Sequence, residues 1–99
     1  MKPQALPKDF AFEKLIPLWK VESSGIQMTR EFIFQDFKQA FAFMSLCAQY
    51  AEELGHHPDW TNSWNRVLVH LSTHSMNSLT TLDIETAKAM DTFALQVKL

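Results

Sequence analysis

Apolar and polar positions alternate in two parts of the chain, and each part predicts a β-hairpin. Between residues 26 and 34, apolar side chains of one parity indicate a strand with one buried face, namely Ile26, Met28, Phe32 and Phe34. Residues 19–22 are the expected partner strand, because the intervening residues 23–25 (Ser-Ser-Gly) offer a short loop with a glycine for a positive φ. Arg30 interrupts the stripe, and the sequence gives no reason for it.

A second hairpin is predicted from residues 59–63 and 66–73, with a turn at Trp64-Asn65. One face of the latter strand is expected to join the core: Val67, Val69, Leu71 and Thr73. The opposite face carries Leu68, His70, Ser72 and His74. Its two histidines are therefore expected on a more polar surface.

Helical spacing of apolar residues marks three further segments. The clearest helix spans residues 36–54, with an expected core-facing stripe of Phe37, Ala40, Phe41, Met44, Ala48, Ala51 and Leu54. Gly55 is placed to end this helix as a left-handed cap, and Pro58 prevents its resumption. A last helix runs from about Thr81 into the C-terminus, with a stripe of Ile84, Ala87, Met90, Ala94 and Val97. A short helix is expected over residues 9–16, with an inward face of Phe10, Leu15 and Ile16.

The predicted order is helix, two strands, helix, two strands, helix, with no repeat or linker. Two antiparallel hairpins separated by a helix favour an α+β fold, in which a four-stranded antiparallel sheet carries helices on one face. The whole chain, residues 1–99, is expected to form one domain. The second face of the sheet would then be open to solvent, to a ligand or to another subunit.

Composition narrows the functional classes. The apolar content of 46% excludes a disordered chain, and a net charge of −2 provides no basic field for a nucleic-acid backbone. No segment approaches the ~20 apolar residues that span a bilayer, and the N-terminus lacks the apolar run of a signal peptide. The single cysteine, Cys47, forms no internal disulfide and is expected to be a buried thiol. We therefore expect a cytoplasmic protein with no nucleic-acid or membrane partner.

All four histidines lie between residues 56 and 74, around the second predicted hairpin. With their neighbours they form an ordered set, which reads Glu52, three residues, His56-His57-Pro58, five residues, Trp64, nine residues, His74, eight residues, Asp83. This set resembles the signature of the pterin-4a-carbinolamine dehydratase family. Residues 32–37 resemble the family's strand-to-helix junction, and the similarity extends from about residue 28 to residue 87. Gly55 is a mild departure, because relatives often carry a polar residue there.

The resemblance implies an enzyme that removes water from a 4a-hydroxytetrahydropterin, left behind by an aromatic amino acid hydroxylase, to give a quinonoid dihydropterin. It also implies that His56, His57 and His74 form the acid/base and substrate-contacting set. One group must protonate the departing hydroxyl and another must accept the proton from N5, and imidazoles do either at neutral pH. Which histidine is acid and which is base does not follow from spacing. The pterin is the substrate, and no further cofactor or metal is expected.

A supporting or substrate-binding role is expected for a second group: Glu52, Gly55, Trp60, Ser72, Thr73, Ser75 and Asp83. Glu52 lies one helical turn before His56, near enough to hold an imidazole, although it also fits a solvated helix position. Trp60 offers an aromatic wall for a flat pterin or simply a packing residue. Asp83 is three residues after Thr80, so it fits either a capping box of the last helix or a group that orients the site.

Two other interpretations stay open. A metal site is suggested by the four-residue spacing of His70 and His74, but on a strand these residues would stand about 13 Å apart. We therefore treat His70 as a partly exposed strand residue. A non-enzymatic binding or dimerisation-cofactor module is the second alternative, because some members of the family have that role. The resemblance also implies a homo-oligomer, either a dimer or a tetramer.

Overall fold

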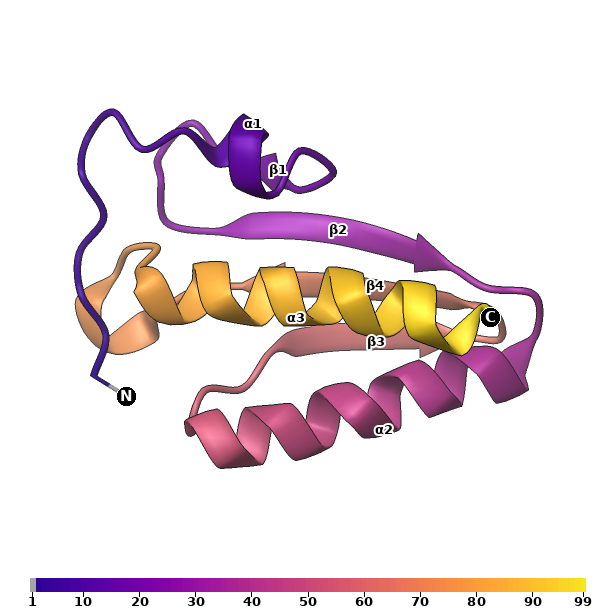
Figure 1. The fold of residues 1–99 in the computed structure, drawn as a ribbon. Coiled ribbons are helices and arrows are strands. Elements are labelled where there is room, and N and C mark those ends of the chain that lie inside the picture. Colours follow the sequence, from indigo (N-terminus) through magenta and orange to yellow (C-terminus); the bar gives the residue numbers. More distant parts are fainter. Residues whose placement is uncertain (1) are drawn as a thin grey trace.

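The computed structural model describes residues 2–99, and its centre is one four-stranded antiparallel sheet (Figure 1). The sheet is ordered β1-β2-β4-β3, and its strands are β1 (Lys20–Val21), β2 (Met28–Ile33), β3 (Asp59–Ser63) and β4 (Arg66–Leu71). Both predicted hairpins are confirmed, since β1 pairs with β2 and β3 pairs with β4. The position of Ile26 was predicted wrongly, because Ile26 precedes β2 and is 37% exposed instead of buried. The hairpins join at the centre of the sheet, where Phe32 of β2 lies opposite Val67 of β4.

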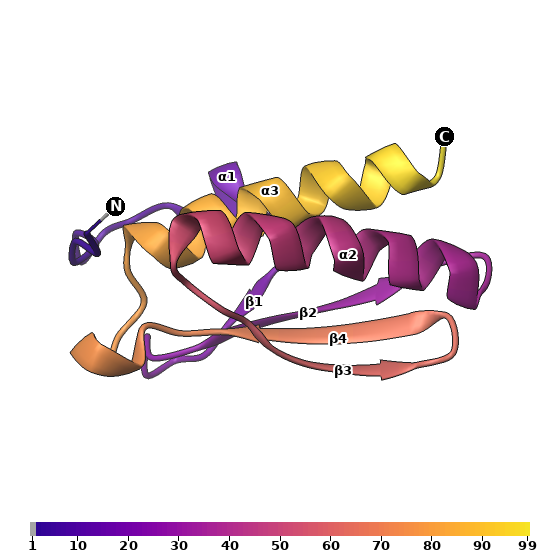
Figure 2. The same ribbon diagram turned by 90° about the horizontal axis from the view of Figure 1, so that it is seen from below.

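Two long helices cover one face of this sheet, and the other face is left open (Figure 2). They are α2 (Phe37–Leu54) and α3 (Thr81–Val97), and they follow the short helix α1 (Phe12–Leu15) in the chain. A 3₁₀ turn, η1 (His74–Met76), connects β4 to the loop before α3. The predicted α+β fold and the order of its elements are confirmed. None of the helices within residues 2–99 combines the length and the apolar character that a membrane crossing requires.

The core lies between the sheet and the two long helices. At its aromatic centre, the ring of Phe43 lies 4.6 Å from that of Phe32 and 5.0 Å from that of Phe34, measured between centroids. The predicted inner face of β4 is confirmed, because Val67, Val69, Leu71 and Thr73 are all buried. The predicted stripe of α3 is also buried at Ile84, Ala87, Met90 and Ala94, and Val97 packs partly buried against it.

The stripe predicted for α2 is partly wrong. Phe37 and Phe41 are 46% and 55% exposed, and Ala48 is exposed as well. The buried residues of α2 are Ala40, Phe43, Cys47 and Ala51, so Cys47 is a buried thiol as expected. Apolar residues occupy two neighbouring stripes of this helix, and their period is the same. Periodicity therefore identified the helix without showing which stripe faces the sheet.

The N-terminal helix is shorter than the predicted residues 9–16. The amide of Phe10 donates to the carbonyl of Pro7 at 3.1 Å, which makes a turn instead of a first helical turn. Pro17 disfavours helical backbone at the residue before it, and Ile16 accordingly adopts φ −138°. Ile16 is buried as predicted, but Leu15 is half exposed.

Arg30 has a structural explanation that the sequence did not provide. Its guanidinium forms an ion pair with Asp91 of α3 and lies 4.1 Å from the centroid of the Phe32 ring. The same oxygen of Asp91 accepts a hydrogen bond of 2.8 Å from Nε1 of Trp19. Arg30 therefore interrupts the apolar stripe of β2 because it links that strand to α3.

Candidate active site

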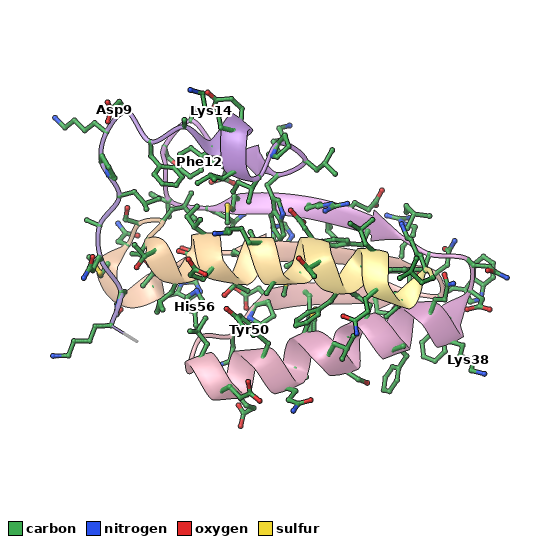
Figure 3. The ribbon with its side chains drawn as sticks, in the orientation of Figure 1. Asp9, Phe12, Lys14, Lys38, Tyr50 and His56 are labelled. Atoms are coloured by element: carbon green, nitrogen blue, oxygen red, sulfur yellow. The ribbon has the colours of Figure 1, made fainter. Side chains whose placement is uncertain are left out.

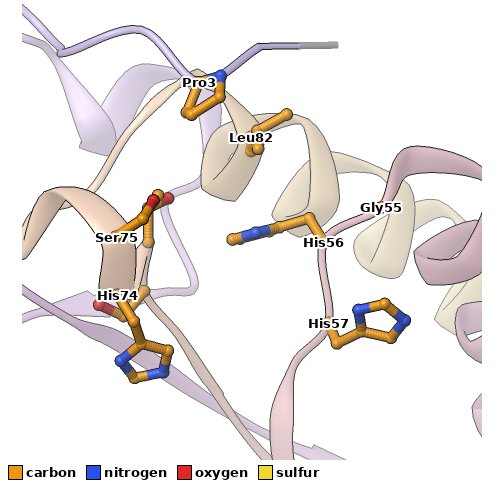
Figure 4. Close-up of a pocket in the computed structure, with 9 residues that line it drawn as sticks. Pro3, Gly55, His56, His57, His74, Ser75 and Leu82 are labelled. Atoms are coloured by element: carbon orange, nitrogen blue, oxygen red, sulfur yellow. The ribbon is translucent and has the colours of Figure 1, made fainter.

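A cavity of about 380 Å³ opens at the end of the molecule where α2 stops and α3 begins (Figure 4). Its wall is formed by segments that are far apart in the chain. The lining residues are Pro3, Gly55, His56, His57, Ser72, Thr73, His74, Ser75 and Leu82. The structure therefore brings together the three predicted histidines, three predicted hydroxyl residues and Gly55.

The end of α2 fixes the position of His56 and His57. Gly55 adopts the left-handed conformation at φ 70°, and its amide donates to the carbonyl of Ala51 at 2.9 Å. The amide of His56 donates to the same carbonyl at 3.1 Å, so the loop is tied to the helix at both residues. The predicted helix end at Gly55 is confirmed. Figure 3 shows His56 between the end of α2 and the first turns of α3.

His56 is held by a buried carboxylate. Its Nε2 lies 2.6 Å from Oδ1 of Asp83, and Asp83 is fully buried. The other carboxylate oxygen accepts a hydrogen bond of 2.8 Å from the hydroxyl of Thr73 and one of 2.9 Å from the amide of Thr80. Because both oxygens of Asp83 act as acceptors, Nε2 of His56 is the donor in their contact. The neutral ring then presents Nδ1, with its lone pair, as its second nitrogen.

The two interpretations of Asp83 are compatible. Its contact with the Thr80 amide is one half of a capping box that starts α3, and the hydroxyl of Thr80 accepts the other bond. Its contact with His56 orients an imidazole on the cavity wall. One side chain therefore joins the start of α3 to the exit loop of α2.

His57 and His74 are paired with carboxylates that are exposed to solvent. Nε2 of His57 lies 2.5 Å from Oε2 of Glu52, and in Figure 4 its ring is turned towards α2. Nε2 of His74 lies 3.4 Å from Oδ2 of Asp59. The side chains of His57 and His74 are 60% and 80% exposed, so these pairs contribute little to stability.

Trp60 and His70 lie outside the cavity. Trp60 of β3 lines a separate hollow under α2, together with Phe41, Met44, Ser45 and Ala48. His70 faces the open side of the sheet, where its Nδ1 lies 3.0 Å from the hydroxyl of Thr29. Within residues 2–99, no three His, Cys, Asp or Glu side chains are grouped as a metal site would require.

Sequence reasoning missed three residues of this region. Pro3 and Leu82 line the cavity, and Asp59 contacts His74 at its rim. Leu82 lies two residues after Thr80, the N-terminal cap of α3, and that cap was predicted. Pro3 and Asp59 reach the site only through tertiary folding, and no spacing in the sequence indicates either contact.

Comparison with known proteins agrees with this architecture. The model of the family described as "Pterin 4 alpha carbinolamine dehydratase" matches residues 4–93. Relatives from Brucella ovis and Brucella canis, each named "putative pterin-4-alpha-carbinolamine dehydratase", are 49% identical over 76 residues, which are 77% of this chain and 78% of theirs. The chain belongs to the pterin-4a-carbinolamine dehydratase family.

Two solved structures resemble the fold. The crystal structure of a transcriptional coactivator/pterin dehydratase from Brucella melitensis matches with a TM-score of 0.78 and 46% identity, over 82% of this chain and 86% of that one. A pterin dehydratase-like protein identified as a RuBisCO assembly factor in the alpha-carboxysome matches with a TM-score of 0.67 and 22% identity, over 77% of this chain and 88% of that one. The second likeness concerns the fold alone.

Proposed function

We propose that this protein dehydrates a 4a-hydroxytetrahydropterin to the quinonoid dihydropterin, with His56, His57 and His74 as its acid/base and substrate-contacting residues. One observation carries the proposal: imidazoles from two distant segments line a single open cavity, and each is paired with a carboxylate. Membership of the family supports the same activity. The hydroxyl groups of Ser72, Thr73 and Ser75 line the same cavity and suit the polar edge of a pterin.

The proposed reaction requires two proton transfers. An acid protonates the 4a-hydroxyl, the C4a–O bond breaks and water leaves. A base removes the proton from N5, and the N5–C4a double bond forms. Loss of water leaves the oxidation level of the ring unchanged, so the proposal includes no redox cofactor. Histidine suits both transfers because its charge changes near neutral pH.

A stopped-flow assay on freshly generated 4a-carbinolamine tests this proposal. We expect His56→Ala, His57→Ala and His74→Ala each to lower kcat. The fall should be about 100-fold or more for a residue that transfers a proton. His70→Ala is the matched control, because His70 lies outside the cavity, and it is expected to retain activity. The proposal is wrong if the intact protein dehydrates the pterin no faster than buffer does.

A non-enzymatic binding module is the second candidate function. The description of the Brucella melitensis relative as a transcriptional coactivator/pterin dehydratase favours it, and the exposed apolar stripe of α2 offers a contact surface. The two functions would use different residues. A variant that lacks all three cavity histidines would lose dehydration but keep a binding function that uses α2.

The setting of the protein is part of the same proposal. We infer a homo-oligomer that contacts through α2, because Phe37 and Phe41 stand exposed on that helix. A cytoplasmic location and a link to an aromatic amino acid hydroxylase, which would produce the substrate, complete the proposal. The link is tested by an assay that asks whether this protein dehydrates the 4a-hydroxytetrahydropterin released by such a hydroxylase.

A further inference from the structure

The segment of residues 3–6, here the N-terminal strap, is fastened to the start of α3 (Figure 1). The amide of Gln4 donates to Oγ1 of Thr81 at 3.1 Å, and the amide of Thr81 donates to the carbonyl of Gln4 at 3.0 Å. Ala5 forms an antiparallel bridge with Thr80. Leu6 packs against the core, so the strap is held along its length.

This attachment determines which groups α3 presents to the cavity. The first amides of a helix lack partners within the helix, and they often bind ligands. Here the strap accepts the amide of Thr81, and Oγ1 of Thr80 accepts the amide of Leu82 at 3.2 Å. The helix start therefore offers the cavity an apolar side chain, Leu82, in place of free N–H donors.

Pro3 completes this apolar part of the wall. It is half buried, whereas the neighbouring Lys2 and Gln4 are exposed, and it lines the cavity. Figure 4 shows Pro3 beside Leu82, with His56 next to Leu82 and the rings of His57 and His74 farther away. The cavity therefore has an apolar region at Pro3 and Leu82 and a polar region of imidazoles and hydroxyls.

We propose that the N-terminal strap is part of the substrate-binding wall, in which Pro3 and Leu82 contact one face of the pterin ring. A pterin has apolar faces and a polar edge, and the lining of the cavity divides in the same way. This inference rests on the proposed function. Contact with a ring face is the same before and during loss of water, so it contributes equally to ground-state and transition-state binding. The strap therefore affects KM and leaves kcat unchanged.

Pro3→Gly tests the contact directly, and Lys2→Gly is its matched control on the adjacent exposed residue. We expect Pro3→Gly to raise KM by about three- to tenfold with kcat unchanged, because part of one small apolar contact is lost. The Kd of a dihydropterin without the 4a-hydroxyl should rise by the same factor, whereas Lys2→Gly should leave both constants unchanged. Equal Kd values for the two variants and the intact protein would overturn the inference.

Thr81→Ala and Thr81→Ser test whether the attachment of the strap matters. The alanine removes the acceptor of the Gln4 amide, and the serine keeps it. We expect weaker dihydropterin binding for Thr81→Ala and normal binding for Thr81→Ser. If Thr81→Ala lowers only the melting temperature and not the affinity, the strap is a helix cap alone and the inference is wrong. Binding without faster dehydration by the intact protein would instead refute the proposed function and leave this inference standing.

Discussion

At the residue scale, Asp83 is the buried side chain that joins His56 to the start of α3. It accepts hydrogen bonds from the hydroxyl of Thr73, the amide of Thr80 and the ring of His56. The hydroxyl of Thr80 lies 2.7 Å from that of Thr73, so the network continues behind the carboxylate. Burial of a charge without partners is costly, and these contacts give each oxygen of the buried carboxylate a partner. A change at Asp83 therefore affects both the stability of the fold and the orientation of His56.

Asp83→Asn should change the tautomer of His56. If the amide oxygen replaces Oδ2, the amide N–H₂ faces Nε2 of His56 and forces that nitrogen to become an acceptor. We expect the ring proton to move from Nε2 to Nδ1, kcat to fall about tenfold or more, and stability to fall by about 1–3 kcal/mol. Nitrogen-15 NMR of the imidazole reports the tautomer, and urea unfolding reports the stability.

Glu85→Gln is the control for this experiment, because Glu85 lies on the same helix but pairs with Lys88 and does not line the cavity. It should leave the His56 tautomer and kcat unchanged. An unchanged tautomer in Asp83→Asn would show that the carboxylate does not set the state of His56.

Burial raises the pKa of the Cys47 thiol from 9.0 to about 12. The unfolded chain therefore loses this proton first, and stability that is complete below pH 9 is lost as the pH rises towards 12. We expect the free energy of unfolding to fall by about 2 kcal/mol from this group between pH 8 and pH 10.5. Urea titrations at the two pH values measure the fall, and Cys47→Ala should reduce it. Equal falls in the two proteins would contradict the prediction.

Burial also raises the pKa of Tyr50, whose smaller effect has the same sign and remains in both proteins.

The sequence allowed some residues of the site to be predicted because their chemistry and spacing are local. His56 and His57 directly follow a helix end that Gly55 and Pro58 mark, and His74 follows a strand with clear parity. Asp59 and Pro3 could not be predicted, because their contacts depend on how separate elements pack. Trp60 was expected either as a wall for the ligand or as a packing residue, and the structure places it under α2, packed against the core.

At the scale of elements, the two ends of α2 are capped in different ways: by a side chain at the start and by a left-handed backbone at the end. At its start, Asp36 accepts the amide of Gln39 at 2.9 Å, which satisfies one of the free donors of the first turn. At its end, Gly55 supplies the left-handed backbone that turns the chain towards the cavity. Both ends were predictable, because caps depend on local sequence. The buried face was not, because it is set by the sheet and by α3.

Gly55→Ala isolates the effect of this backbone conformation. A Cβ at Gly55 would meet nothing within 4 Å, so the cost comes only from the left-handed φ of 70°. We expect a loss of about 1 kcal/mol of stability, together with reduced activity because His56 and His57 follow in the chain. Gly55→Asn is the control, since asparagine tolerates this conformation better, and it should lose less. Urea unfolding of the three proteins would falsify the prediction if alanine and glycine were equally stable.

At the scale of the whole molecule, the core is enclosed between the sheet and the two long helices, but one apolar surface stays exposed on α2. The sheet and the inner faces of α2 and α3 enclose the core, while the outer stripe of α2 exposes Phe37 and Phe41, whose rings lie 5.6 Å apart. The site sits at the end of the sandwich where α2 stops, and the strap closes its apolar side. Assembly through α2 would therefore leave the cavity accessible, because Phe37 and Phe41 belong to the first turns of the same helix.

Phe41→Glu tests assembly through this stripe. A charge in the middle of an apolar contact must be desolvated without a partner, so we expect the variant to be monomeric while the intact protein is a dimer or tetramer. Light scattering coupled to size exclusion measures the mass of each. Leu95→Glu is the matched control, because Leu95 is an equally apolar, 69% exposed residue on α3, outside the stripe, and this variant should keep the oligomer. A monomeric intact protein would show that the contact does not exist. Dissociation by Leu95→Glu but not by Phe41→Glu would place the contact outside the α2 stripe. Retention of dehydratase activity by monomeric Phe41→Glu would show in addition that each chain carries a complete site.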